Sequence, residues 1–528
     1  MIKSTLIKNL ILAFSIMLCA SCIKNEGKTI NFPETNLEIE SMIPKPLKVT
    51  STHSAFGLDK YTKISTSNNN TQCIEISEFL ANKIALKTSL EIPINQEAQE
   101  NTGGVIFINQ LNNSDSKSPE SYQLNITKDS IILNSTTAEG AFRGIQTIRQ
   151  IIPEISNDTL SEQKIWVIPS GTITDSPNFA YRGSMLDVAR HFFSVKDVKK
   201  YIDHLAYYKI NKLHLHLSDD QGWRIEIKSW PKLTEIGGST EVGGESGGFY
   251  TQEEYKDIVA YAAKHFITII PEIDMPGHTN AASVSYPFLN GNGKKLTLYE
   301  GTQVGFSTFD TKKDTVYAFI DDVIRELSAI NPGPYMHIGG DESHVTKKED
   351  FNYFISKVSK IVKKHGKRMI GWDEIVHADI DSNAIAQFWN NEKNAIEASK
   401  KGLKVILSPG KKAYLDMKYD DKSEYGLHWA GYIPVDTAYV WTPEKYVKGL
   451  PKDAILGIEA PLWSETISNI TELEYLAFPR IIGYSELGWT TEENRDWENY
   501  KIRLANQVPY LERMNINFYR SSLIDWKK

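Results

Sequence analysis

Apolar runs of strand length recur eight times in the second part of the chain, and most are separated by segments with a helical spacing of apolar residues. The runs end near Leu186, Ser218, Asp274, Gly340, Trp372, Trp389, Ser408 and Trp463. The helical patterns cover Val195–Tyr208, Gln252–Lys264, Thr315–Ile330 and Asp350–Lys364. This alternation over roughly 340 residues predicts a (β/α)8 barrel with insertions. A doubly wound open sheet is the alternative, but nothing in the chain resembles its glycine fingerprint.

A different pattern precedes the barrel. Short strand-like runs cover Val105–Ile108, Tyr122–Ile126 and Ser130–Leu133, and Ala138–Ile152 has the apolar spacing of an amphipathic helix. We therefore predict a small α+β domain over residues 41–174. Its expected role is supporting, because no group of catalytic residue types stands out in it. The turn-forming sequence Asp-Ser-Pro that follows marks the boundary, so the barrel is predicted to cover residues 175–528.

The first 22 residues have the pattern of an export signal. Two lysines precede an apolar run over residues 10–18, which is too short to span a bilayer as a helix. The run ends in Cys-Ala-Ser-Cys, which resembles a bacterial lipoprotein signal with Cys22 as the lipidated residue, although Cys19 stands where an aliphatic residue is usual. We predict a signal peptide with a lipobox over residues 1–22 and a polar tether over residues 23–40. The expected location is the periplasm or the outer membrane, with a plain secretory signal as the alternative.

The composition and the net charge of the chain indicate which classes of binding partner to expect. Of the 528 residues, 41% are hydrophobic and 24% are charged, as in an ordinary globular protein. Lys and Arg total 59 against 66 Asp and Glu, so the net charge is -7. Nucleic acid is not an expected partner, because binding it requires phosphate neutralisation. The only expected contact with a membrane is the lipid anchor, and the sequence does not indicate an oligomeric state.

Polar and aromatic side chains gather where the predicted strands end, which is where a (β/α)8 barrel carries its catalytic residues. Seven ends carry such residues: Asp187 and Arg190, Asp219 and Asp220, Asp274 and His278, Asp341 and Glu342, Asp373 and Glu374, Gln387 and Trp389, and Trp463 and Glu465. Any one of these clusters is as well explained by a structural ion pair or a loop cap. Carboxylates and tryptophans at seven ends instead indicate a pocket for glycoside cleavage, in which acids protonate the leaving oxygen and indole faces hold the ring.

Asp341 and Glu342 are adjacent, and this limits their roles. The usual retaining pair of carboxyls stands about 5–5.5 Å apart on opposite sides of the scissile bond. Neighbours at one strand end approach a sugar from the same side, so one can be the acid while the other stabilises a different group. If the substrate carries a 2-acetamido group, its carbonyl oxygen can attack C1. The second carboxylate would then orient the amide and balance the charge of an oxazolinium.

Four long motifs resemble glycoside hydrolase family 20, the β-N-acetylhexosaminidases. They are residues 185–192, 214–224, 271–278 and 337–342. The resemblance extends over nearly the whole mature chain and implies a small domain before a catalytic barrel, with the substrate-assisted cleavage for which this family is known. It implies an exo-acting enzyme that hydrolyses terminal non-reducing β-linked GlcNAc or GalNAc with retention, through an oxazolinium intermediate. A glycan or amino-sugar oligosaccharide is thus the expected partner, and no cofactor and no metal are expected.

The resemblance also implies a role for each matching residue. Glu342 resembles the general acid/base, Asp341 the carboxylate that orients the acetamido group, and Tyr414 the hydroxyl that bonds the acetamido oxygen. Asp219 and His278 resemble a relay that tunes the acid. The residues implied to bond the sugar hydroxyls are Arg190, Asp416 and Glu465. The residues implied to form aromatic walls around the acetamido methyl and the ring face are Trp372, Trp389 and Trp463, and Trp429 is implied on the leaving-group side.

Two other functions stay open at this stage. His214 and His216 resemble the His-x-His pair that binds metal in some barrel hydrolases, and a metal-dependent hydrolase is therefore one alternative. Period-two alternation points both rings into the barrel, but both precede the strand end, so the favoured interpretation is core histidines with satisfied hydrogen bonds. The other alternative is a lipid-anchored sugar-binding protein with an inactive site. The intact set of Asp341, Glu342 and Tyr414 argues against it.

Overall fold

The computed structural model describes residues 32–66, 71–95, 103–111, 118–157, 164–293 and 295–526. Cys22, the predicted signal peptide and residues 23–31 of the predicted tether lie outside these ranges. The described end of that tether is packed: Leu37, in a 3-10 helix over Leu37–Ile39, is fully buried, and its N–H donates to the Ser51 hydroxyl. This end of the segment is therefore part of the first domain. Within the described ranges, no helix is long and apolar enough to cross a membrane.

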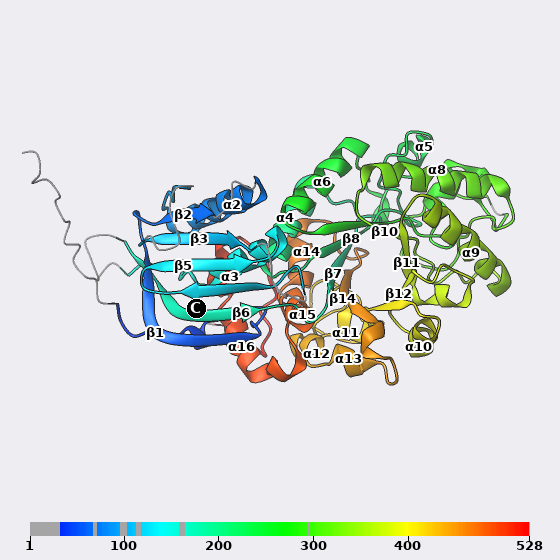
Figure 1. Cartoon of the computed structure of the whole chain (residues 1–528). Coiled ribbons are helices and arrows are strands. Elements are labelled where there is room, and N and C mark those ends of the chain that lie inside the picture. Colours follow the sequence, from blue (N-terminus) through cyan, green and yellow to red (C-terminus); the bar gives the residue numbers. More distant parts are fainter. Residues whose placement is uncertain are drawn as a thin grey trace, which may run out of the picture.

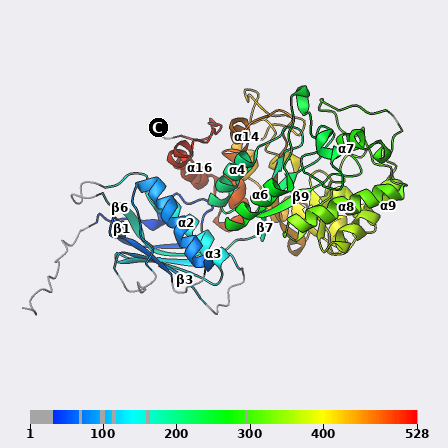
Figure 2. The same ribbon diagram turned by 90° about the horizontal axis from the view of Figure 1, so that it is seen from above.

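A six-stranded mixed sheet forms the first domain, in the order β1-β6-β4-β5-β3-β2 (Figure 1). Its strands are β1 (Lys48–Leu58), β2 (Lys63–Thr66), β3 (Val105–Gln110), β4 (Tyr122–Ile126), β5 (Ser130–Ser135) and β6 (Trp166–Asp175). The helices α2 (Thr71–Thr88) and α3 (Ala138–Ile151) cover one face of this sheet (Figure 2). The helix α3 begins at Ala138 because the Thr137 hydroxyl accepts a hydrogen bond from the Gly140 N–H.

Eight parallel strands close the barrel, in which the last strand, β14, pairs with the first, β7. The strands are β7 (Tyr181–Asp187), β8 (Lys212–His216), β9 (Thr268–Glu272), β10 (Tyr335–His337), β11 (Arg368–Trp372), β12 (Ile385–Phe388), β13 (Lys404–Leu407) and β14 (Ile455–Leu462). The predicted fold class, a (β/α)8 barrel after a small α+β domain, is confirmed. The carboxyl ends of all eight strands therefore meet at one face.

Helices of very different length lie between the barrel strands and after the last of them (Figure 1). The longer helices are α4 (Val195–Tyr207), α6 (Gln252–Lys264), α8 (Asp314–Ile330), α9 (Lys348–Lys364), α10 (Glu392–Lys400), α14 (Ile470–Ala477) and α15 (Arg480–Trp489). The shorter pieces are α5 (Lys232–Glu235), η2 (Val242–Gly244), α7 (Asn280–Ser285), η3 (Pro287–Leu289), η4 (Asp373–His377), α11 (Gly410–Ala413), α12 (Val435–Tyr439), α13 (Pro443–Tyr446), η5 (Lys452–Ala454) and η6 (Glu492–Asn494). The short α11 and its neighbours leave a long, loop-rich insertion between β13 and β14.

The C-terminal helices close the chain back on the first domain. They are α16 (Trp497–Ala505) and α17 (Val508–Arg513). Arg503 donates to the carbonyl oxygen of Met42 over 2.9 Å, and Gln507 donates to that of Ser41 over 2.7 Å. The segment that leads into the first strand of the sheet is therefore held by residues more than four hundred positions later in the chain.

A buried carboxylate joins the two domains. Glu120 lies 2.8 Å from Arg143 of α3 and 2.9 Å from Arg182, the second residue of β7. Burial opposes the charge of this carboxylate, but the two guanidinium groups lower the pKa of Glu120 to about 2. Because Arg182 lies at the amino end of its strand, this junction is at the bottom of the barrel. The first domain thus supports the barrel from the end opposite the carboxyl ends of the strands.

Candidate active site

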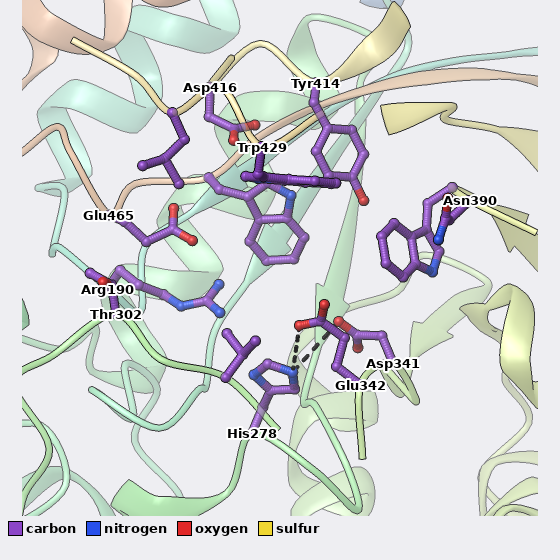
Figure 3. A pocket seen from close by; sticks show the side chains of 14 residues that line it. Arg190, His278, Thr302, Asp341, Glu342, Asn390, Tyr414, Asp416, Trp429 and Glu465 are labelled. Atoms are coloured by element: carbon purple, nitrogen blue, oxygen red, sulfur yellow. Dashed lines mark ion pairs between the residues drawn. The ribbon is translucent and has the colours of Figure 1, made fainter. Parts of the chain in front are cut away.

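A pocket opens at the carboxyl ends of the barrel strands (Figure 3). Its volume is about 280 Å³. It is lined by Arg190, His278, Thr302, Val304, Asp341, Glu342, Trp389, Asn390, Tyr414, Asp416, Leu427, Trp429, Trp463 and Glu465. The pocket thus brings together all the residues to which the resemblance assigns a role in the site except Asp219 and Trp372, which lie behind its wall.

The turn after β10 aims Asp341 and Glu342 into this pocket. Gly339 has a φ of 65°, and a Cβ there would lie 1.8 Å from the Oδ1 of Asp274, so only glycine fits. The same Asp274 oxygen accepts a hydrogen bond from the Gly340 N–H over 3.1 Å. The backbone of Glu342 is in the left-handed region, with a φ of 42°. Non-glycine residues adopt this conformation at a cost in free energy, and such residues cluster at functional sites.

The two neighbouring carboxyls share one side of the cavity, as the sequence predicts (Figure 3). Burial raises the pKa of the Glu342 carboxyl, and the nearby charge of Asp341 raises it further. Glu342 therefore keeps its proton to a higher pH than an exposed glutamate does. A carboxyl that is protonated near the working pH is suited to donate a proton to a leaving oxygen.

His278 connects this pair of carboxyls to a charge behind the wall. Its Nδ1 is hydrogen-bonded to Asp219 Oδ1 over 3.0 Å. Its Nε2 lies 3.7 Å from Asp341 Oδ2 and 3.9 Å from Glu342 Oε2, the two ion pairs drawn in Figure 3. Burial disfavours the cation, but the carboxylates of Asp219 and Asp341 raise the pKa of His278 well above its usual range. Asp219 and His278, which the resemblance implies form a relay, are therefore in contact, and the raised pKa favours the imidazolium form of His278 beside Glu342.

Arg190, Asp416 and Glu465 face the cavity from the side opposite Asp341 (Figure 3). The Arg190 guanidinium lies 2.8 Å from the carboxylate of Asp219 and stacks over the Trp463 ring at 4.9 Å. Burial raises the pKa of both Asp416 and Glu465. Among the described residues, neither side-chain oxygen of Asp416 has a hydrogen-bond partner, and Oε2 of Glu465 has none either. These buried acceptors require donors, which sugar hydroxyls supply.

Aromatic rings form the rest of the pocket. The centroid of the Tyr414 ring is 5.7 Å from that of Trp429 and 6.3 Å from that of Trp463, while Trp389 is 6.2 Å from Trp429. Burial raises the pKa of the Tyr414 hydroxyl well above its usual range, so this group keeps its proton and can donate a hydrogen bond. Trp429 is 58% exposed and stands at the rim, which is where a leaving group would pass.

Trp372, which the resemblance implies is part of the aromatic wall, is not among the residues that line the cavity. The ring is only 1% exposed, and its Nε1 donates to Glu272 over 3.1 Å. Its centroid is 5.8 Å from that of Trp463. Trp372, the last residue of β11, therefore packs behind Trp463, with its ring against Glu272 and His337 of the barrel interior.

The histidines of β8 also point into the barrel interior. His214 lies 2.9 Å from Glu459 and 3.0 Å from Glu272, and His216 is hydrogen-bonded to Glu272 and Asp219. His214, Glu272 and His337 are close enough to hold a metal ion, as are other acid and histidine groups around the pocket. Nδ1 of His214 and both ring nitrogens of His216 are hydrogen-bonded to carboxylates, whereas Nε2 of His214, 3.0 Å from Glu272, makes no hydrogen bond among the described residues.

Four residues of the pocket lining were not predicted from the sequence. They are Thr302, Val304, Asn390 and Leu427. Asn390 directly follows Trp389, and its position next to a predicted site residue was the one available signal. The other three come from long loops without periodicity, and nothing in their local sequence points to the pocket. The buried carboxylate Glu459 was also missed, because it stands as an isolated acid within an apolar strand. Glu272 belongs to the polar strand end that includes Asp274 and His278, but the sequence predicted no role for it.

Comparisons with known proteins give one consistent result. The model of "Glycosyl hydrolase family 20, catalytic domain" matches residues 179–492, and that of "Glycosyl hydrolase family 20, domain 2" matches residues 40–176. The β-N-acetylhexosaminidase of Cellulomonas fimi is 37% identical over 410 residues, which are 77% of this chain and 82% of that protein. The structure of the family 20 β-N-acetylhexosaminidase from Streptomyces coelicolor A3(2) is 42% identical, has a TM-score of 0.88, and is matched over 93% of this chain and 100% of its own. A mutant Streptomyces plicatus β-hexosaminidase in complex with the product GlcNAc is 43% identical, with a TM-score of 0.88 and coverage of 94% of this chain and 100% of its own.

Proposed function

Because the chain belongs to glycosyl hydrolase family 20, we propose how its pocket residues divide the work of the family's reaction. The protein is an exo-β-N-acetylhexosaminidase that cleaves with retention by substrate-assisted catalysis. The observation that carries the assignment of roles is the pair Asp341 and Glu342, two carboxyls on one side of the cavity in different environments.

In this scheme Glu342 donates its proton to the glycosidic oxygen as the bond from C1 to that oxygen breaks. The carbonyl oxygen of the 2-acetamido group forms a bond to C1 on the opposite face, which gives an oxazolinium ion. Asp341 accepts a hydrogen bond from the amide N–H and balances the positive charge, and the Tyr414 hydroxyl donates to the acetamido oxygen. Glu342, now ionised, then takes a proton from a water molecule that attacks C1 and opens the oxazolinium ring. Because this is the second displacement at C1, the anomeric configuration is retained.

The rest of the pocket holds one sugar ring. Arg190 donates to ring hydroxyls. Both carboxyl oxygens of Asp416 and Oε2 of Glu465, which have no hydrogen-bond partner among the described residues, accept from other hydroxyls. The faces of Trp389 and Trp463 pack against the acetamido methyl and the ring, and Trp429 at the rim contacts the leaving group. A cavity of about 280 Å³ suits one terminal residue, and we propose terminal GlcNAc or GalNAc as that residue. The complex of the Streptomyces plicatus relative with GlcNAc supports this substrate class.

Turnover of 4-nitrophenyl N-acetyl-β-D-glucosaminide tests the activity directly. We expect the β anomer of GlcNAc to appear first in proton NMR spectra, because two displacements at C1 restore the configuration. Exhaustive chelation is expected to leave the rate unchanged. Loss of activity on chelation that added metal restores would support the metal-dependent alternative, and initial release of the α anomer would contradict the two-step mechanism. No turnover at all would support an inactive sugar-binding protein.

We also propose that the enzyme is exported and anchored through a lipid on Cys22. The short apolar run and the lipobox-like ending support this proposal. A single acyl chain holds a protein on a membrane only marginally, whereas several chains on one cysteine hold it firmly. Cys22→Ala is therefore expected to move most of the activity from the membrane fraction to the soluble fraction. Cys19→Ala is the matched control and should stay with the membrane. Equal membrane retention of the two variants would contradict lipidation at Cys22.

A further inference from the structure

A line of buried charges continues below the pocket, beyond the relay of Asp219 and His278. His216, the last residue of β8, is 0% exposed and lies between two carboxylates. Its Nδ1 is 2.5 Å from Glu272 Oε2, and its Nε2 is 2.7 Å from Asp219 Oδ2. Neither the reaction scheme above nor a core-packing role requires a histidine with both nitrogens bound to acids.

These contacts determine the charge of the His216 ring. Burial opposes ionisation of Asp219, but Arg190 and His278 hold the pKa of this carboxyl well below its usual range. The surrounding histidines likewise lower the pKa of Glu272, against the effect of burial. Two ionised carboxylates can only accept hydrogen bonds, so both ring nitrogens of His216 must donate. The two contacts favour the imidazolium form of His216 and raise its pKa well above the usual range, against the effect of burial.

Asp219 depends on this cation for its orientation. Its Oδ1 accepts hydrogen bonds from His278 Nδ1 and from the N–H of Asp220. Its Oδ2 is held by His216 and by Arg190, and Arg190 is shared with Asp187. Loss of His216 would leave Oδ2 with only a shared partner. The carboxylate that fixes the His278 ring would then be free to turn.

We propose that His216 is a positioning residue for the acid: clamped between Glu272 and Asp219, it holds Asp219 in the orientation that keeps His278 beside Glu342. The inference rests on the proposed role of Glu342. The same clamp reaches the sugar-binding side, because Glu272 also accepts from Trp372, and the His216 ring meets the Trp463 ring edge-on at 5.0 Å. One buried cation thus supports both the acid and an aromatic wall.

Several other charged groups act on the same sites. Those that face His216 are Glu272, Asp219 and Asp274, and His214 contacts the same Glu272. Those that face Glu342 are Asp341, His278, Arg190, His344 and Tyr414. The charge of His278 lowers the pKa of Glu342, so a loosened His278 allows that pKa to rise.

The test compares His216→Gln with His214→Gln. His214 is the matched control because it lies on the same strand, is equally buried and contacts the same Glu272, but has Glu459 in place of Asp219 as its second partner. The measurement is kcat/KM against pH, for an N-acetylglucosaminide with an activated phenolate and for a β-linked GlcNAc disaccharide. Circular dichroism and thermal unfolding establish that both variants are folded.

We expect the basic limb of the His216→Gln profile to move upward by on the order of one pH unit, the usual effect when a cation within about 6 Å of an acid is displaced. The displaced cation is His278, which would no longer be held 3.9 Å from Glu342. Turnover of the disaccharide should fall about tenfold more than that of the activated substrate, because only the former requires a well-placed acid. His214→Gln should keep the position of the basic limb. Equal shifts in the two variants, or no shift in either, would overturn the proposal.

Two further measurements separate the possible failures. Glu342→Gln is measured in parallel. If this variant keeps full activity on the disaccharide, the proposed role of Glu342 is wrong. If it loses activity as expected while the pH profile of His216→Gln keeps its position, only the inference about His216 is wrong. A neutron crystal structure of the unaltered enzyme near pH 7 needs no variant. It should show deuterium on both ring nitrogens of His216, and a bare nitrogen would overturn the proposal even if His216→Gln does not fold.

Discussion

Glu342→Gln is expected to lower kcat/KM on natural β-linked N-acetylhexosaminides by about 10²–10⁴-fold, the usual contribution of a general acid. The same substitution should cost far less for aryl glycosides with an activated phenolate, because such a leaving group departs without a proton. The raised pKa of Glu342 and its place beside the cationic His278 are what suit it to this role.

A series of aryl N-acetylglucosaminides with leaving groups of increasing pKa measures the effect. The loss in Glu342→Gln should grow steadily along the series at the bond-breaking step. Glu374→Gln is the matched control, because Glu374 is a nearby buried acid that hydrogen-bonds the Trp389 indole and does not line the pocket. Any loss in that variant should be the same for every leaving group. A flat series for Glu342→Gln would mean that another group is the acid.

Replacement of the 2-acetamido group of the substrate by a hydroxyl is expected to lower kcat/KM of the unaltered enzyme by at least about 10³-fold. Well-oriented intramolecular groups reach effective molarities of about 10⁵–10⁸ M, against about 55 M for the water that would have to replace the amide. The paired N-acetylglucosaminide and glucoside must carry the same leaving group. Comparable kcat/KM values for the two would show that no neighbouring amide takes part.

Asp341→Asn tests the same mechanism by a change in the protein instead of in the substrate. The variant should lose roughly 10²–10³-fold in rate, as when other preorganised charge-stabilising groups are removed. Because every substrate must use its acetamido group, this loss should not depend on the leaving group. Asp341→Asn and Glu342→Gln would then differ in their dependence on the leaving group although the residues are adjacent in the chain.

Much of this site follows from local sequence. Apolar periodicity predicts the alternation of strands and helices, and strand ends in a (β/α)8 barrel converge on one face, so the sequence alone places Arg190, His278 and Glu342 together. The Gly-Gly-Asp-Glu turn requires glycine at Gly339, because this position has no room for a side chain. Adjacency alone already argues that Asp341 and Glu342 cannot flank the sugar from opposite sides.

Other features of the site depend on closure of the barrel, and only the tertiary structure shows them. Glu272, His216 and Trp372 come from β9, β8 and β11, and only the strand register shows that they meet in one buried cluster. The burial of Trp372 behind the wall and the raised pKa of Glu342 both depend on residues that are distant in the sequence. Such residues supply the desolvation and the nearby charges that shift a pKa. The sequence by itself determined which residues stand at the strand ends, since side-chain alternation is local. Which of them reach the pocket and which hold the others in place is set by packing across the barrel, and this only the folded structure decides.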